Sequence, residues 1–235
     1  MSSSQIDAAD PEIFDLSPDG KTLYVSNEED AEVGIIDMAT KKRTGAIKVG
    51  GEPEGVKVSP DGKWVFVTSE VTSVVHAIDA ASAKVVKNIP VGKRPRRFAF
   101  NADASELWVS NELGASVSVI SVKDLAVTHT VKFELKGLRA KDITPVDLKL
   151  AKDGKTMFVG LGQANHVAFV DVSIKKVREL ALAGKRAWGL GLNPAGSQLW
   201  VANGLSDDVT VIDTATARPL KTIKAGRVPH SIVVD

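Results

Sequence analysis

The stretch PEGVKVSPDGKWVFVTSEVTSVVHAID (residues 53–79) contains three short apolar segments separated by turn residues. The first two are joined by Pro60, Asp61 and Gly62. Proline presets the first dihedral angle of a turn and glycine accepts a positive φ, so this tripeptide predicts a tight connection. Alternating apolar residues on either side of such a turn are typical of β-strands. The stretch therefore predicts three antiparallel strands.

The same pattern recurs along the chain with a period of about 42 residues. A proline opens most copies, at Pro11, Pro53, Pro95, Pro145 and Pro229. The separations are 42, 42, 50 and 84 residues, and Ala187 stands at the skipped position. The longer separation of 50 contains an insertion, LKGLRAKD at 135–142. Internal repeats of this length are typical of stacked or radial architectures.

Within each period, apolar residues recur at fixed offsets. The second segment carries an aromatic column, and the third begins at a valine column: Tyr24, Phe66, Trp108, Phe158, Trp200; Val33, Val75, Val117, Val167, Val209. The fourth segment is more polar at alternate positions, which suits an outer strand with one wet face. Each period therefore predicts four antiparallel strands whose apolar faces must be covered by neighbouring sheets.

We therefore predict an all-β protein, a β-propeller built from four-stranded antiparallel blades. A flat solenoid is the alternative, but its units are usually shorter. The chain reads as a single domain, 1–235, with five complete repeats and an extra inner strand: about 10–50, 52–92, 94–134, 144–184 and 186–226, then 229–235.

The repeats leave the closure of the ring open. The chain fits a fragment, a ring of five or six blades, or a propeller completed by another copy. Residues 3–9 have the length for one short outer strand at most. An open propeller would expose an apolar sheet face and an unpaired edge, which favours a homo-oligomer through the unpaired blade edges.

Composition excludes several classes of function. The net charge of +1 gives no general attraction to nucleic acid or to an anionic membrane. Cysteine is absent, which excludes disulfides, thiolate metal sites and a cysteine nucleophile. The N-terminus lacks the basic start and apolar centre of a signal peptide, so the protein is either cytoplasmic or has lost such a segment.

Several motifs resemble one known family. The segments YVSN (24–27), WVAN (200–203), EPEGVKVSPDGKW (52–64) and GRVP (226–229), with the insertion before Pro145, are similar to the YVTN-repeat β-propeller family. The match is closest to β-propeller proteins associated with pyrroloquinoline-quinone (PQQ)-dependent catabolism. Members of that branch are exported and seven-bladed, which implies a periplasmic or secreted protein working alongside quinoprotein dehydrogenases. No segment here has a motif for the quinone, so we expect no cofactor.

The most irregular column of the repeat directly follows the proline position. In a propeller, the loops entering the inner strands meet at one end of the central channel, which is the usual ligand face of this fold. The candidate ligand-binding residues in and beside this column are Glu12, Glu54, Arg96, Arg97, Asp147, Arg186, Trp188 and His230.

Two interpretations of this column are open. In the first, the channel mouth binds a small anion or an acidic loop of a protein partner, with Arg96 and Arg186 as donors and Trp188 as a stacking surface. In the second, it is a solvated mouth in which Glu12 and Glu54 pair with Arg96 and His230.

Other motifs carry less chemistry. The remaining histidines show no metal-ligand spacing on one face, and there is no nucleophile elbow, so we predict no metal site and no catalytic residues. The turns at Asp19, Asp61 and Asp153 lack the dense oxygen ligands of a calcium loop. Glu28, Glu70 and Glu112 share one offset and form either an acidic binding face or the solvated ends of hairpins.

The sequence thus favours a non-enzymatic scaffold or binding module over an enzyme. Its expected partners are a protein or a small anionic ligand, and neither nucleic acid nor membrane. One rival is a lactonase-like hydrolase, for which Glu12, Glu54, Asp147 and His230 would supply the chemistry. Another is a propeller fragment, or an engineered propeller, without activity.

Overall fold

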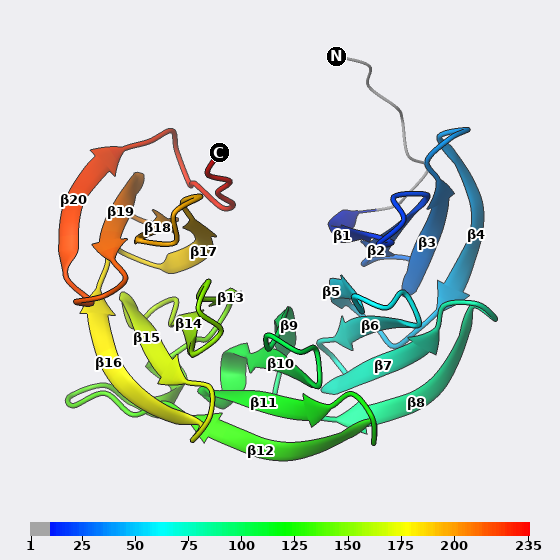
Figure 1. Ribbon diagram of the computed structural model, residues 1–235, viewed down its shortest axis with the longest axis horizontal. Helices are drawn as coiled ribbons and strands as arrows, with labels where there is room; N and C mark the ends of the chain where they lie inside the picture. Colours follow the sequence, from blue (N-terminus) through cyan, green and yellow to red (C-terminus); the bar gives the residue numbers. More distant parts are fainter. Residues whose placement is uncertain (1–9) are drawn as a thin grey trace.

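The structure is a computed structural model that describes residues 10–235, and its five sheets form an open arc (Figure 1). Each sheet has four antiparallel strands in chain order, with the first strand at the centre of the arc and the fourth at the rim (Figure 1). We number these sheets as blades one to five along the chain. The predicted all-β propeller with four-stranded blades is confirmed.

The strands begin and end close to the predicted repeat boundaries. Blades one to three comprise β1 (Pro11–Leu16), β2 (Thr22–Asn27), β3 (Glu32–Asp37), β4 (Lys42–Lys48); β5 (Pro53–Val58), β6 (Trp64–Ser69), β7 (Val74–Asp79), β8 (Lys84–Pro90); β9 (Pro95–Phe100), β10 (Glu106–Asn111), β11 (Ser116–Ser121), β12 (Ala126–Lys132).

The last two blades follow the insertion. They comprise β13 (Leu148–Leu150), β14 (Thr156–Gly160), β15 (His166–Asp171), β16 (Lys176–Leu182); β17 (Ala187–Leu192), β18 (Gln198–Asn203), β19 (Asp208–Asp213), β20 (Pro219–Lys224). Two single 3₁₀ turns, η1 (Glu112–Gly114) and η2 (Ala140–Asp142), complete the regular structure of the described residues.

The hydrophobic core lies between the blades. Consecutive blades pack face to face, and a separate apolar cluster fills each of the four junctions. The aromatic column faces the following blade, and Phe66, Trp108 and Phe158 are each at most 1% exposed. Packing between sheets, as the repeat predicted, therefore holds the arc together.

The first hairpin turn of each blade needs a positive φ at its third position, which glycine favours in every blade but the third. Gly62 has a φ of +72°, and the residue at the same position in blade three, Ala104, is held at +57°. The Asp61 carboxylate accepts hydrogen bonds from the Ser59 hydroxyl and the Lys63 backbone N–H at 2.5 and 3.0 Å. The aspartates of these turns thus stabilise the turn itself.

The arc is open between blade one and blade five (Figure 1). On the free face of blade one, Phe14 is 68% exposed. The residues at the same position in the other blades are at most 9% exposed, because each packs on a preceding sheet: Val56, Phe98, Leu148, Leu190. Blade one therefore presents a face built for burial.

The prediction of an inner strand over 229–235 is wrong. These residues lie against β17, with the His230 carbonyl beside Gly189 and Ile232 beside Gly191, but they form no strand. In each blade the inner strand is hydrogen-bonded to the second strand of the same sheet. No described segment provides such a partner strand for residues 229–235. An extended segment without such a ladder is not a β-strand. The expectation for residues 3–9 lies outside the described residues.

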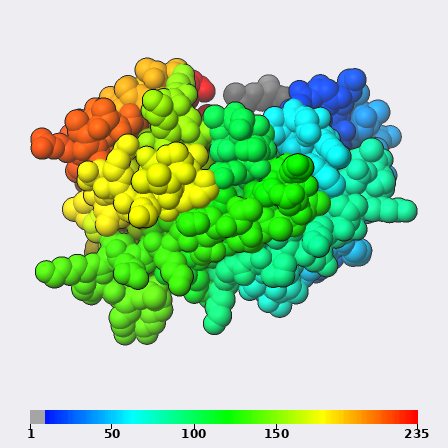
Figure 2. Space-filling view, turned by 60° about the horizontal axis from the view of Figure 1, so that its bottom comes forward, coloured from blue at the N-terminus to red at the C-terminus, as the bar shows by residue number. Residues whose placement is uncertain are grey.

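The insertion is a surface loop anchored at both ends. Phe133 and Ile143 are buried in the junction between blades three and four, whereas residues 136–141 are exposed. In the space-filling view these green residues project from the rim of the molecule (Figure 2). The described chain also contains no helix long and apolar enough to cross a membrane.

Candidate functional site

A central cavity of about 620 Å³, open to solvent, is lined by residues from all five blades and from the C-terminal segment. Its lining combines charged, aromatic and aliphatic side chains: Ile13, Phe14, Asp15, Val56, Lys57, Arg97, Phe98, Val146, Asp147, Lys149, Trp188, Leu190, His230, Ser231, Ile232, Val233. Four of the predicted site residues, Arg97, Asp147, Trp188 and His230, are among them. The structure therefore brings half of the predicted set to one cavity.

Arg96 is the centre of a buried ion-pair network beside this cavity. Its guanidinium contacts Glu54 at 3.1 Å, Glu70 at 2.8 Å and Glu112 at 3.2 Å. Arg94 adds contacts to Glu70 at 2.6 Å and to Glu112 at 3.2 Å. Both Nη atoms of Arg96 contact these glutamates. Arg96 therefore positions the three carboxylates, and its Nη atoms are not free to bind a ligand.

The network decides between the expected ion pairs. Glu54 pairs with Arg96, as the solvated-mouth interpretation predicted, and also with Arg97 at 3.0 Å. Glu12 and His230, however, form no ion pair within residues 10–235. The expectation that these two join the network is wrong, because the buried Arg96 reaches the hairpin ends of its neighbours instead.

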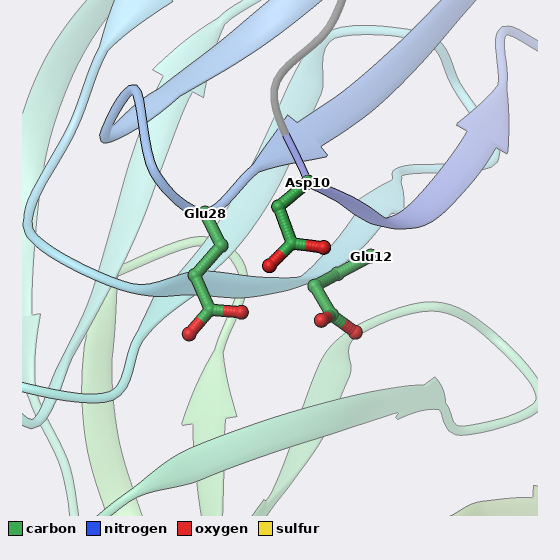
Figure 3. Close-up of side chains that lie close together, drawn as sticks. All are labelled: Asp10, Glu12 and Glu28. Carbon is green, nitrogen blue, oxygen red and sulfur yellow. The ribbon is translucent and has the colours of Figure 1, made fainter.

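Sequence reasoning missed the role of the hairpin glutamates. Glu28, Glu70 and Glu112 share an offset, yet they do not form one acidic face, since Glu70 and Glu112 turn toward Arg94 and Arg96. Glu28 instead lies with Glu12 and Asp10 (Figure 3).

Asp10, Glu12 and Glu28 form an acidic cluster at the mouth of blade one (Figure 3). One carboxylate oxygen of each lies within 4.8 Å of the others. Burial raises the pKa of Glu12 to about 7, and the charges of Glu54 and Glu28 add to the effect. Asp10 precedes the proline column, where the corresponding residues Glu52, Arg94 and Arg186 share its positive φ. The recurrence of a charged residue directly before the proline column is the sequence pattern that points to Asp10.

Replacing Glu12 by glutamine tests the charge state of the acidic cluster. The folded protein holds a proton on Glu12 between pH 4.5 and about 7 that the unfolded chain releases, so wild-type stability falls as pH rises through this window. Glutamine mimics the protonated carboxyl. We expect Tm to exceed that of the wild type by an amount that grows from pH 4.5 to 7 and then stays constant at about 2 °C or more, since solvent screens part of the repulsion.

The measurement is a set of thermal melts between pH 4.5 and 8.5 on wild type, Glu12→Gln and the exposed control Glu29→Gln. Comparison between variants removes the opposing contribution of His76 and His230, whose pKa values are lowered mainly by burial. A Glu12→Gln curve parallel to the wild type at every pH would show that Glu12 is charged throughout.

The opposite side of the cavity is basic and aromatic. Trp188 is 6% exposed, with the Arg186 guanidinium 3.9 Å and the Arg96 guanidinium 5.2 Å from its ring centroid. The prediction of Trp188 as a stacking surface for a ligand therefore needs correction, because arginines of the protein already stack on it. The His230 ring lies 5.5 Å away, tilted by 49°.

Two donors in the cavity wall have no partner. Arg97 uses Nη2 for Glu54, whereas its Nη1 and the Trp188 Nε1 are buried without a hydrogen-bond acceptor in the described structure. Burial lowers the pKa of Arg97, and burial together with the charge of Arg97 lowers the pKa of His230. The charges of Arg96 and Arg186 lower the pKa of His230 as well, and the charge of Glu54 acts against them.

The carboxylates that line the cavity are committed to the backbone. Asp147 accepts the N–H groups of Leu148 at 2.9 Å and Leu190 at 2.8 Å. Asp15, which the sequence did not single out, accepts the Val58 N–H at 2.8 Å and pairs with Lys57 at 3.0 Å. Both therefore tie neighbouring inner strands together.

Two family descriptions match the sequence. Residues 6–104 match "YNCE-like beta-propeller", and residues 56–235 match "Lactonase, 7-bladed beta-propeller". None of the curated proteins matches the chain.

Solved structures share the fold at low identity. The periplasmic gluconolactonase PpgL of Pseudomonas aeruginosa is 22% identical with a TM-score of 0.79, over 94% of this chain and 71% of that one. A putative 6-phosphogluconolactonase from Bacteroides fragilis is 20% identical with a TM-score of 0.81, over 98% and 74%. Hydrazine synthase from Kuenenia stuttgartiensis is 18% identical with a TM-score of 0.71, over 99% and 91%.

These identities establish the fold and not the activity. The second family match spans more than half of the chain and includes the cavity-lining residues Arg97, Asp147, Trp188 and His230. The chain thus belongs to the lactonase-type seven-bladed β-propeller family.

Proposed function

We propose that this protein is a binding module whose central cavity holds a small organic ligand without transforming it. The observation that carries the proposal is the cavity of about 620 Å³, which has the size of a small-molecule site. Its wall holds unpartnered donors, while its two carboxylates, Asp15 and Asp147, are engaged by backbone N–H groups. Binding groups are thus available in the wall, while both lining carboxylates are engaged.

A substitution that fills the cavity tests this function. Ser231 is exposed and lines the cavity, so Ser231→Trp should abolish binding of any small molecule that stabilises the wild type in a thermal-shift panel of sugars, sugar acids and sugar lactones. Ala195→Trp, on the exposed turn between β17 and β18, is the matched control. Ligands that bind Ser231→Trp as well as the wild type would place the site elsewhere.

Lactone hydrolysis is the second candidate. Two observations favour it: the match to the lactonase family and the acidic cluster, in which Glu12 has a pKa of about 7, near the ideal for a general base at neutral pH. Two of the similar structures also carry lactonase names. In this reaction, Glu12 would take a proton from water at the channel mouth.

A lactonase would show turnover of D-glucono-δ-lactone above the spontaneous rate in a pH-stat. Its rate should rise with pH through about 7 as Glu12 loses its proton, and Glu12→Gln should lose at least about a hundredfold in rate. Equal rates with and without protein would retire this candidate and leave the binding module.

We also propose a periplasmic or secreted location, alongside a PQQ-dependent dehydrogenase. The YVTN-type motifs support this, and one similar structure is described as periplasmic. Co-purification of the protein with a quinoprotein from the periplasmic fraction supports the proposal. Recovery of the protein in the cytoplasmic fraction alone contradicts it.

The two free faces of the arc favour self-association. Phe14 and Leu16 on blade one are 68% and 42% exposed, and they belong to the face type that packs on a preceding blade in all four junctions. Blade five ends in the complementary type, which the C-terminal segment covers at β17 and leaves exposed at β20, so the outer part of this face can pack on blade one of another copy. We expect the sedimentation mass to rise with concentration, and Phe14→Asp to lower it toward one chain.

Val71→Asp controls for the added charge, since Val71 is 64% exposed on a loop outside the opening. Sedimentation velocity across a concentration series is the measurement. A single-chain mass for the wild type at all concentrations contradicts the association.

A further inference from the structure

We propose that the cavity ligand is a small organic monocarboxylate, whose carboxylate binds between Arg97 and Trp188. The inference rests on the proposed binding function and adds the chemical class of the ligand and the atoms that recognise it. It follows from the hydrogen-bond donors, the charge balance and the shape of the lining.

Unpartnered donors mark the anion position. Among the described residues, Arg97 Nη1, Trp188 Nε1 and Arg96 Nε are buried N–H groups without acceptors. Arg97 on β9 and Trp188 on β17 both line the cavity, and the Arg96 guanidinium lies 5.2 Å from the Trp188 ring centroid. A buried donor without an acceptor costs about 1–3 kcal/mol, more for a charged group, and an oxyanion would supply the missing acceptors.

The charge of the lining selects a monoanion. Its cations are Lys57, Lys149 and Arg97 and its carboxylates are Asp15 and Asp147, and one nitrogen of Arg97 is paired with buried Glu54. Lys57 is paired with Asp15, whereas exposed Lys149 forms no ion pair within residues 10–235. The acidic cluster of Asp10, Glu12 and Glu28 at the mouth disfavours additional negative charge on the ligand.

The remaining lining selects an organic molecule over an inorganic ion. Phe14, Phe98 and Val146 present apolar surface, and Ser231 and the peptide groups around it offer hydrogen bonds to hydroxyl groups. The unpartnered donors lie just inside the wall. The His230 ring lies 5.5 Å from the Trp188 ring and, within residues 10–235, hydrogen-bonds to the neighbouring Ser231 hydroxyl alone, so we expect this side chain to move aside when the carboxylate enters.

Calorimetric titration with D-gluconate and sorbitol tests the inference, because the two share a hydroxylated six-carbon chain and differ in the carboxylate. We expect gluconate to bind the wild type at low salt and sorbitol to bind at least tenfold more weakly. Arg97→Gln should weaken gluconate about ten- to a hundredfold, the loss of one charged hydrogen bond. Trp188→Phe should weaken gluconate binding about three- to tenfold and leave the protein's small affinity for sorbitol unchanged.

Arg139→Gln is the matched control, since Arg139 is exposed and pairs with Asp142 in the distant insertion. Arg97→Lys keeps the charge and should retain part of the affinity if Arg97→Gln does not fold. Equal binding of gluconate and sorbitol, sensitive to Ser231→Trp, would overturn the carboxylate inference and leave the binding function standing. Binding of neither probe overturns both, and gluconate binding unchanged by Arg97→Gln and Trp188→Phe overturns the inference.

Discussion

Trp108→Ala is expected to lower the free energy of unfolding by about 3–5 kcal/mol, the cost typical of removing a large aromatic side chain from a core. Trp108 is fully buried on β10 and fills the junction between blades three and four with Met157 and Val159. Alanine leaves a cavity that two rigid sheets cannot collapse into. Urea unfolding followed by circular dichroism measures the effect.

Trp64→Ala provides the matched control. Trp64 is on β6 but only partly buried, at the margin of the junction between blades two and three. Its replacement should cost less than half as much. Similar losses for both tryptophans would mean that the blade junctions do not dominate stability.

Arg96→Met is expected to lower the free energy of unfolding by about 3–5 kcal/mol at pH 8, because it leaves buried carboxylates without their counter-charge. Glu54 and Glu70 are 4% and 7% exposed, and both contact Arg96 directly. Burial already raises the pKa of Glu70 to about 7, although Arg96 and Arg94 act against it. Without Arg96 we expect these carboxyls to take up protons instead of staying charged.

The loss for Arg96→Met should therefore shrink as pH falls from 8 to 5, where the abandoned carboxyls are protonated. Arg139→Met, which breaks an exposed ion pair with Asp142, should leave stability nearly unchanged at every pH, because solvent screens such a pair. Denaturant unfolding at several pH values distinguishes the two. A pH-independent loss for Arg96→Met would assign its role to packing and not to charge.

The repeat made most of the fold predictable from sequence. The proline column marks the start of β1, β5 and β9, and the skipped position Ala187 marks the start of β17. The prediction fails where a strand depends on hydrogen bonds to a neighbouring strand. The segment 229–235 has the apolar pattern of an inner strand but no second strand, and β13 starts only at Leu148 because the insertion displaces the residues before it.

The candidate site was only partly predictable. The irregular column after the proline identified Arg97, Asp147, Trp188 and His230 as neighbours, because strand order alone places them at the centre. It did not identify which side chains pair. Arg96 binds Glu70 and Glu112 from hairpin ends, and Asp147 bonds to the backbone of β17, since these choices depend on rotamers and burial.

The most direct test of the central claim is a crystal structure of the protein grown with D-gluconate. We expect density for the ligand in the central cavity, with carboxylate oxygens within hydrogen-bond distance of Arg97 Nη1 and Trp188 Nε1 and the His230 side chain turned away. An empty cavity at a gluconate concentration that stabilises the protein, or a ligand bound outside it, would contradict the account.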